Sequence, residues 1–324
     1  MNEEVIKLEN ITKDYTIRTG LFGKPKKNRA LDKVNVSITK GEILGVVGES
    51  GSGKTTLGFV MLGLANKDSG NIYFEGKNID ALNKAQIKEF RLKSQMIFQD
   101  PFESLNPMLT VGESVLTPLL LAKDRIPKSE RMLRVIAALN SAGLEPGEEY
   151  ISKIPSELSG GQRQRVGIAR ALINNPSFIV ADEPVSMLDV SIRADLLNLL
   201  KEQAKSKQVS MIFISHDIII TRYIADKILV MHLGQVVEMG ASKDVVENPK
   251  HPYTVLLIKS MPEVRDRDLV PIDEQVEYNV DVINSGSDEC SFVSKCPFAM
   301  DICAQHRPEM KEIDPGHFVA CYLF

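Results

Sequence analysis

The sequence lacks a long apolar run, an apolar leader and a strong excess of charge of one sign. Its nearest approach to a membrane span, Val115 to Ala122, is much shorter than the eighteen or so residues that a spanning helix needs. The first residues, Met1 to Glu4, are acidic and do not form the apolar core of a secretion signal. A formal net charge of −4 gives no reason to expect a nucleic acid partner. We therefore expect a cytosolic protein that reaches a membrane only through a partner.

Cysteine is also scarce and is absent from the large N-terminal region. The chain has 324 residues and four cysteines, Cys290, Cys296, Cys303 and Cys321. In a reducing cytosol, such clustering indicates a metal or cluster site more than disulfides. The apolar content of 43% and charged content of 25% are ordinary for a soluble globular protein. A chain of this length holds one large α/β domain with a smaller appendage, or two modest domains.

One octapeptide, Gly48 to Thr55, carries most of the functional information. It is a glycine, four residues, and then Gly-Lys-Thr, the pattern of a phosphate-binding loop. An apolar run over 43–47 predicts a buried strand before it, and residues 56–64 can open a helix after it. In this context backbone N–H groups turn toward phosphate oxygens and the helix N-terminus adds positive potential. The expected nucleotide contacts are Gly48, Ser50, Gly51, Gly53, Lys54, Thr55 and Thr56.

Two roles in this loop follow from side-chain chemistry. Lys54 would reach the β- and γ-phosphates, and the Thr55 hydroxyl would sit on Mg²⁺. The alternative is a glycine-rich turn that binds nothing. Lysine and threonine together, directly after a strand, argue against that alternative.

A second glycine pair follows Leu158. The residues Ser159, Gly160, Gly161 and Gln162 precede a helix with apolar residues at helical spacing. Ser-Gly-Gly exposes N–H groups at a helix start, which makes a second anion-binding feature. Taken alone, it is equally an N-cap and a flexible turn. One chain rarely needs two such loops for one nucleotide, unless two chains face each other and each supplies one.

A third motif ends in two acidic residues. The apolar run Phe178 to Ala181 predicts a buried strand, and Asp182 and Glu183 follow it. A carboxylate at the end of such a strand suits Mg²⁺, held directly or through water. A second carboxylate beside it can polarise the attacking water. The alternative is a solvated pair of carboxylates before a turn.

Residue patterns predict an α/β fold with a mostly parallel sheet covered on both faces. Residues 85–142 change to helical periodicity and predict a helical insert, extending to about 160. We expect a main domain over 1–250 and a C-terminal extension over 251–324 that begins with a helix and continues through a linker or extended strand pair at 262–289. Predicted strands are 5–17, 30–38, 43–47, 71–74, 178–181 and 211–214; predicted helices include 129–142, 190–204 and 251–260; 18–29 is predicted to be an exposed hairpin or loop.

The three motifs, in this order, closely resemble the ATPase subunit of an ABC (ATP-binding cassette) transporter, over residues 5–245. Gln99 matches the glutamine loop of that family, Asp189 its D-loop and His216 its switch histidine. Met187 stands in the D-loop where a smaller residue is usual, and Tyr15 is placed like the aromatic residue that stacks on adenine. The resemblance implies a P-loop NTPase core with an N-terminal antiparallel β subdomain.

The resemblance also implies a mechanism. The family closes as a head-to-tail dimer around two ATP molecules, so Ser159 and Gly161 of one subunit would complete the γ-phosphate shell of the other. Glu183 would act as general base or water positioner, and His216 would hold the γ-phosphate. Gln99 would touch Mg²⁺ or water and link the site to the helical insert. Placement and neutralisation of phosphate charge then account for catalysis.

Three further stretches resemble the dipeptide and oligopeptide importer branch: residues 99–107, residues 251–254 and the cysteine tail. In that branch the tail is similar to segments that bind a 4Fe-4S cluster through four cysteines. Zinc is the chemical rival, because four thiolates suit it equally. Free buried cysteines are the third possibility, and cysteine spacing alone does not choose among the three.

The branch implies partners. These are a second, non-identical ATPase (this chain being similar to the second, F-type member), two membrane permease subunits and an extracellular solute-binding protein, with this chain at the cytoplasmic face. Members carry dipeptides, oligopeptides, nickel complexes or, in some archaea, oligosaccharides. One rival is a soluble ABC ATPase of DNA repair or translation, but such proteins usually carry two cassettes or long coiled-coil inserts. A second rival is a soluble ATPase whose cysteine tail senses redox state.

Overall fold

The computed structural model describes residues 3–17, 26–100, 105–121, 126–260 and 288–324. Its residues group into two interleaved compact units. We call the first the helical unit and the second the phosphate-loop unit. The helical unit comprises Met1–Ile6, Ile38–Ile43 and Tyr73–Phe213, and the phosphate-loop unit comprises Lys7–Ser37, Leu44–Ile72 and Ile214–Phe324. Strands β1 (Glu4–Ile17), β2 (Lys26–Thr39), β3 (Ile43–Val47), β4 (Ser69–Phe74) and β8 (Ser210–Ser215) contribute residues to both.

The N-terminal strands form a four-stranded sheet in the order β2-β1-β4-β5, where β5 is Lys77–Asn78 and pairs antiparallel with β4. The burial pattern of β2 alternates from Asp32 to Ile38, because every second side chain of that stretch is buried and the ones between are exposed. The predicted strands over 5–17 and 30–38 are thus confirmed. Of the stretch 18–29, which is predicted to be an exposed hairpin or loop, residues 26–29 belong to β2, and residues 18–25 lie outside the described residues.

The phosphate-loop unit is built on strands in the order β11-β12-β10-β9-β3. Strand β3 pairs parallel with β9, as Val47 opposite Val230 shows, and β10 pairs antiparallel with β9 and β12. The other bounds are β9 Lys227–His232, β10 Gln235–Ala241, β11 Lys311–Asp314, β12 His317–Val319, α1 Lys54–Met61, α8 Ile218–Ile224, α9 Ser242–Glu247, α10 Pro252–Lys259, η5 Val293–Lys295 and α11 Asp301–Gln305.

One apolar core holds this unit together. Val47 of β3, Val230 of β9 and Val237 of β10 pack with Ile218 of α8 and with buried residues of α9 and α10. Phe292, from the cysteine tail, belongs to the same cluster and is 1% exposed. The tail is therefore packed into the core that supports the phosphate-loop strand.

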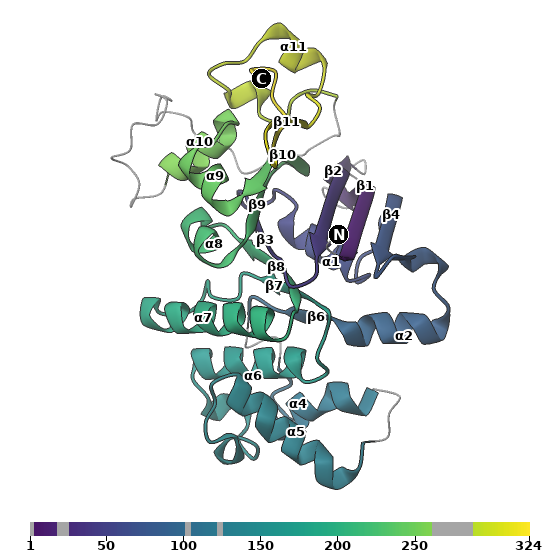
Figure 1. Ribbon diagram of the computed structural model, residues 1–324, viewed down its shortest axis with the longest axis vertical. Helices are drawn as coiled ribbons and strands as arrows, with labels where there is room; N and C mark the ends of the chain where they lie inside the picture. The colour runs from purple at the N-terminus through teal and green to yellow at the C-terminus, as the bar shows by residue number, and fades with distance from the viewer. Residues whose placement is uncertain (1–2, 18–25, 101–104, 122–125, 261–287) are drawn as a thin grey trace. The chain divides into compact units, whose positions relative to one another are not determined.

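In the helical unit, β6 (Ser94–Ile97) pairs parallel with β7 (Phe178–Asp182), and the strand order there is β8-β7-β6. Helices α4, α5 and α6 contact one another (Figure 1). Other bounds are η1 Ile79–Ala81, α2 Lys84–Lys93, α4 Val111–Leu121, α5 Lys128–Ser141, η2 Gly147–Glu149, η3 Pro155–Glu157, α6 Gly160–Leu172 and α7 Val190–Ser206. None of the described helices is long and apolar enough to cross a membrane.

The helical pattern predicted over 85–142 is wrong for β6. Ser94 and Ile97 are buried and the strand pairs with β7, so tertiary pairing decides the conformation of a run too short to show a period of its own. The predicted helices at 129–142, 190–204 and 251–260 are confirmed within a residue or two. The linker predicted at 262–289 lies almost wholly outside the described residues, and the domain boundary near residue 250 stays a prediction.

A buried carboxylate fastens the tail to this unit. Glu238 of β10 is fully buried and accepts the backbone N–H groups of Lys250 and His251, both at 2.9 Å. Its Oε1 also lies 2.7 Å from Nε2 of His317 in β12. One side chain thus joins a central strand, the segment before α10 and a tail strand.

We expect Glu238→Gln to lower the free energy of unfolding by about 2–3 kcal/mol, because it replaces charge-assisted hydrogen bonds and turns an amide NH₂ toward a backbone donor. Urea unfolding checks this. Glu312→Gln is the matched control, since exposed Glu312 accepts a single bond from Gly316; it should change the free energy by less than about 0.5 kcal/mol. Equal effects would contradict the role given to Glu238.

Candidate functional site

The loop after β3 is curled so tightly that side chains do not fit at two positions. Gly48 has φ 154°, and a Cβ added there would lie 2.2 Å from the carbonyl oxygen of Met231. Gly53 has φ 101°, and its Cβ would lie 2.3 Å from the carbonyl oxygen of Ala30. Gly53 is also the N-cap of α1. The glycines predicted from the motif therefore have a steric cause.

Lys54 is turned into the loop. Its side chain is 6% exposed, and Nζ donates to the carbonyl oxygens of Gly48 and Glu49 at 2.8 Å each, with Ser52 Oγ at 3.4 Å. Around it, Ser50, Gly51 and Thr55 are exposed and Thr56 is half-buried. No acidic residue occupies the first turn of α1, so the positive end of the helix is not neutralised from within that turn. This arrangement is a cradle for an anion.

Two more predicted residues belong to the same unit. His216 follows β8 and is exposed, and Asp217 beside it caps α8 by accepting the N–H groups of Ile219 and Ile220 at 2.9 and 3.0 Å. Tyr15 lies near the end of β1 with an exposed ring, and Lys13 Nζ lies 5.1 Å from the ring centroid. Both residues are exposed at the surface.

The helical unit brings the acidic motif and Gln99 together. Asp182 closes β7 and is buried, while Glu183 follows it with φ 43°, a left-handed conformation that costs energy for a residue with a side chain. Gln99 Nε2 donates to Glu183 Oε2 at 3.2 Å. The strained backbone aims the Glu183 carboxylate at the glutamine segment.

A residue that the sequence did not single out supports this segment. Gln164 of α6 is 2% exposed, and its Nε2 donates to the carbonyl oxygen of Phe98 at 3.2 Å. It ties the residue before Gln99 to the helix that begins with the glycine pair. A lone glutamine on a helix carries no signal of such a contact, so only the fold reveals it.

Ser159 is the N-cap of α6. Its hydroxyl accepts the N–H of Gln162 at 3.3 Å, and its own N–H donates to Gln162 Oε1 at 3.0 Å, which is a reciprocal capping box. Gly161 is buried against Ile192, whose Cγ2 would lie 3.0 Å from an added Cβ, while Gly160 is half-buried. Asp189 is the exposed N-cap position of α7, and Met187 is exposed.

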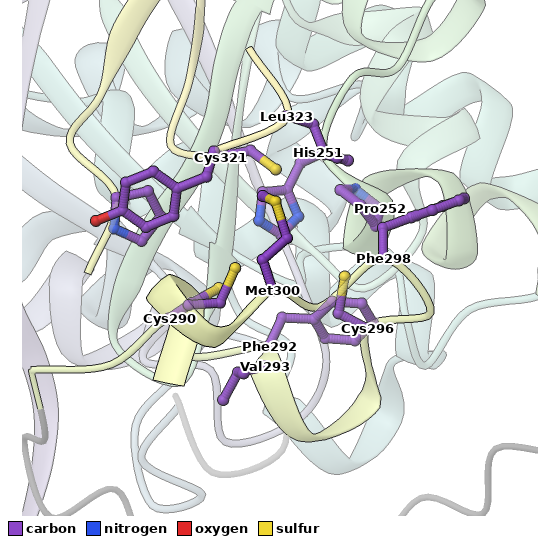
Figure 2. A pocket seen from close by; sticks show the side chains of 13 residues that line it. His251, Pro252, Cys290, Phe292, Val293, Cys296, Phe298, Met300, Cys321 and Leu323 are labelled. Atoms are coloured by element: carbon purple, nitrogen blue, oxygen red, sulfur yellow. The ribbon is translucent and has the colours of Figure 1, made fainter. Parts of the chain in front are cut away.

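The four cysteines line one pocket (Figure 2), together with His251, Phe292 and other tail residues. The cavity measures about 10 Å³, room for about one water molecule. Burial, with repulsion from Cys303, Cys321 and Cys296, raises the pKa of Cys290 to about 11. Burial also raises the pKa values of Cys296 and Cys321. Within the described ranges, no three or more His, Cys, Asp or Glu side chains form a group that could hold a metal ion.

A neutral histidine closes this pocket. His251 is the N-cap of α10, and its Nδ1 accepts the N–H of Tyr253 at 3.0 Å. Because Nδ1 accepts a hydrogen bond, it carries no proton. Burial, together with repulsion from His232, lowers the pKa of His251 to about 3, which is consistent with a neutral ring.

Comparison with known proteins identifies the class. The chain matches the family described as "ABC transporter" over residues 31–186 and the family described as "Oligopeptide/dipeptide transporter, C-terminal region" over residues 237–303. It is 43% identical over 305 residues to a putative oligopeptide transport ATP-binding protein, YkfD, of Bacillus subtilis, covering 93% of this chain and 92% of that protein. The chain belongs to the ABC transporter ATP-binding proteins.

Further similarities support the same class. The oligopeptide transport ATP-binding protein AppF of Bacillus subtilis is 41% identical over 326 residues, which is 99% of this chain and 98% of that protein. The solved dimeric cassette MJ0796, bound to ADP and Pi, has a TM-score of 0.65 at 32% identity and covers 73% of this ABC protein and 98% of its own chain. CbiO1 from Clostridium perfringens has a TM-score of 0.65 at 28% identity, covering 81% and 96%.

The predicted resemblance and the α/β cassette fold are therefore confirmed, and this ABC protein is an ATPase. ATP and Mg²⁺ are the ligands expected of its class. The roles predicted for single residues are not tested by these similarities.

The steric account of the loop makes a prediction. Gly53→Ala should lower the free energy of unfolding by about 2–4 kcal/mol, because the new Cβ meets backbone and the φ is unfavourable. Gly167→Ala is the matched control. Gly167 lies inside α6 with open space around its Cβ position, so alanine should be neutral or stabilise by up to about 1 kcal/mol. Urea unfolding of both variants decides; a harmless Gly53→Ala would refute the account.

Proposed function

We propose that this ATPase is the motor subunit of an importer for dipeptides or oligopeptides. The observation that carries the proposal is Lys54 turned into a phosphate loop with no room for a side chain at Gly48 or Gly53, in a chain that also matches the peptide transporter C-terminal region. The names of the relatives favour peptides as solute. Nickel complexes and archaeal oligosaccharides are the alternatives within the branch. The solute would contact other subunits, so it is identified by transport assay.

The proposed chemistry begins with binding. Lys54 and the loop N–H groups hold the β- and γ-phosphates, and Tyr15 stacks on adenine. The side chains of Thr55, Gln99 and Asp182 would hold Mg²⁺ directly or through water, and the metal would neutralise charge on the phosphate oxygens.

Hydrolysis then requires a placed water. Glu183 accepts a proton from the water as its oxygen bonds to the γ-phosphorus, the bond to the ADP oxygen breaks, and His216 holds the γ-phosphate oxygens. The Gln99 amide, which donates to the Glu183 carboxylate in this structure, orients that base. The left-handed backbone of Glu183 supports the assignment, because such strain clusters at functional sites.

A partner completes each site in this proposal. Ser159, Gly160, Gly161 and Gln162 of one subunit face the γ-phosphate bound to the other, and Asp189 lies at the junction. The exposed Ser159 hydroxyl at a helix N-terminus suits an anion brought by a second chain. The similarity to a dimeric cassette supports a dimer. We propose a second, non-identical ATPase as the partner.

The remaining partners are two membrane permease subunits and an extracellular solute-binding protein, with this ATPase peripheral on the cytoplasmic face. We propose residues 102–120 as the segment that contacts the permease subunits; residues 102–104 lie outside the described ranges. Support comes from apolar side chains on α4 and α5: Leu120, Leu121 and Leu133 are 54%, 57% and 66% exposed. Such a group of exposed leucines is typical of a protein contact surface.

We propose that the cysteine tail holds a 4Fe-4S cluster, with zinc as the alternative. Four thiols around one pocket are the donor set of either group, and mutual repulsion of the thiolates favours a bound cation. The cavity of about 10 Å³ is smaller than a cluster, so loading would require the pocket to open. A soluble ATPase regulated through this tail, with no transport role, is the alternative function.

Glu183→Gln should keep ATP binding but lower turnover by roughly 10²–10⁴-fold, the range for loss of a general base. Steady-state phosphate release and nucleotide binding, measured side by side, test this. Glu148→Gln, an exposed carboxylate of the same unit, should leave both unchanged. Rapid hydrolysis by Glu183→Gln would refute the base assignment.

Protein purified without oxygen should show a broad band in the blue part of the visible spectrum and about four irons and four sulfides per chain. Cys303→Ser, which alters the most buried thiol, should lower the iron content. Zinc without iron would show that the tail holds a structural zinc ion and no cluster. Neither metal would refute both, and would leave the nucleotide site untouched.

A further inference from the structure

A buried tyrosine of the C-terminal region touches the phosphate loop. Tyr253 is the second residue of α10 and is fully buried, and its hydroxyl accepts the backbone N–H of Glu49 at 2.9 Å. Glu49 is the second residue of the loop, and Tyr253 lies more than two hundred positions away in the sequence. The proposed reaction gives Tyr253 no role.

The peptide unit that receives this contact also holds Lys54. The Gly48 carbonyl and the Glu49 N–H belong to one planar unit, and in a trans peptide they point in opposite directions. Lys54 Nζ donates to that carbonyl at 2.8 Å, while the Tyr253 hydroxyl holds the N–H. Rotation of the unit would break both bonds. The tyrosine hydroxyl therefore fixes the acceptor on which the lysine rests.

The ring of Tyr253 is held in turn by the cysteine tail. Its centroid lies 4.5 Å from that of His232 and 5.5 Å from that of Phe292, and the latter also lies 5.4 Å from His232. His232 Nδ1 lies 3.0 Å from Ser291 Oγ, between Cys290 and Phe292. These rings form a packed cluster of the kind that fixes side-chain positions.

Phe292 and His251 are at the same time part of the cysteine pocket wall (Figure 2). Lys295, three residues further along the tail, acts on Glu49 directly: its charge opposes the rise that burial produces in the pKa of that carboxyl. The tail thus reaches the phosphate loop through the ring of Tyr253, whose hydroxyl bonds to Glu49, and through the charge of Lys295.

We propose that Tyr253 is a positioning residue for ATP binding: its hydroxyl orients the Gly48–Glu49 peptide and hence Lys54, and the Phe292 wall of the cysteine pocket sets the position of its ring. The proposal rests on the proposed role of Lys54 in holding ATP phosphates. It makes the tail a support of the nucleotide site, whatever the four thiols bind.

The direct test is Tyr253→Phe, which removes only the hydroxyl. We expect the KM for ATP and the Kd for a fluorescent ATP analogue to rise roughly two- to tenfold, as loss of one hydrogen bond predicts, with kcat changed less than about twofold. Amide exchange of Glu49 without nucleotide should accelerate by a similar factor. Tyr73→Phe in β4 is the matched control and should change none of these.

The tail is tested by Phe292→Leu, with Phe318→Leu of strand β12 as control. At temperatures where thermal unfolding shows both variants folded, only Phe292→Leu should accelerate Glu49 exchange and raise the KM for ATP. Equal behaviour of the two variants would refute the coupling to the pocket wall.

A separate result would contradict the role given to the Tyr253 hydroxyl. Unchanged Glu49 exchange, or faster exchange with unchanged nucleotide affinity, in Tyr253→Phe would overturn the positioning role. Failure of the underlying function is separate, since it would show as normal ATP binding by Lys54→Ala. The exchange measurement in Tyr253→Phe does not depend on that result.

Discussion

The close approach of backbone to backbone around the phosphate loop is the constraint on which the rest of this protein depends. Gly48 and Gly53 have no room for a Cβ because carbonyl oxygens of Met231 and Ala30 lie against them. The strand β9 and the start of β2 must therefore be in place before the loop can take its shape. Lys54 is then enclosed by the loop that carries it, and the same core that buries β3 reaches Phe292 in the tail.

Local chemistry explains which parts of the site the sequence could predict. The phosphate loop, the acidic residues after β7 and the cap of α6 are each short segments that their residue types identify in the sequence. Gln164 and Tyr253 are different, because each acts through one contact with a residue 66 or 204 positions away. The residues next to them in the sequence give no sign of that contact. Strand β6 shows the same limit for secondary structure, since pairing with β7 decides its conformation.

The cysteine tail combines a predictable part with an unpredictable one. Clustering of Cys290, Cys296, Cys303 and Cys321 indicated a metal or cluster site; the four thiols line one pocket, while the described residues hold no group arranged to bind a metal ion. The sequence did not indicate that the wall of this pocket would belong to the core of the phosphate-loop unit. That placement follows from Glu238, whose carboxylate gathers His317 and the segment before α10. A tail fastened by a buried charge keeps a defined position against the fold.

The capping box at Ser159 leads to one more consequence. A hydroxyl can donate one hydrogen bond and accept two, and in this structure the Ser159 hydroxyl accepts the N–H of Gln162. The hydroxyl can therefore still donate its proton to an oxygen of a ligand outside the helix. Aspartate or asparagine would cap α6 as well, but aspartate would meet an incoming phosphate with a second negative charge. The start of α6 thus favours a neutral capping side chain, and the Ser159 hydroxyl provides both an acceptor for the cap and a proton for an anion.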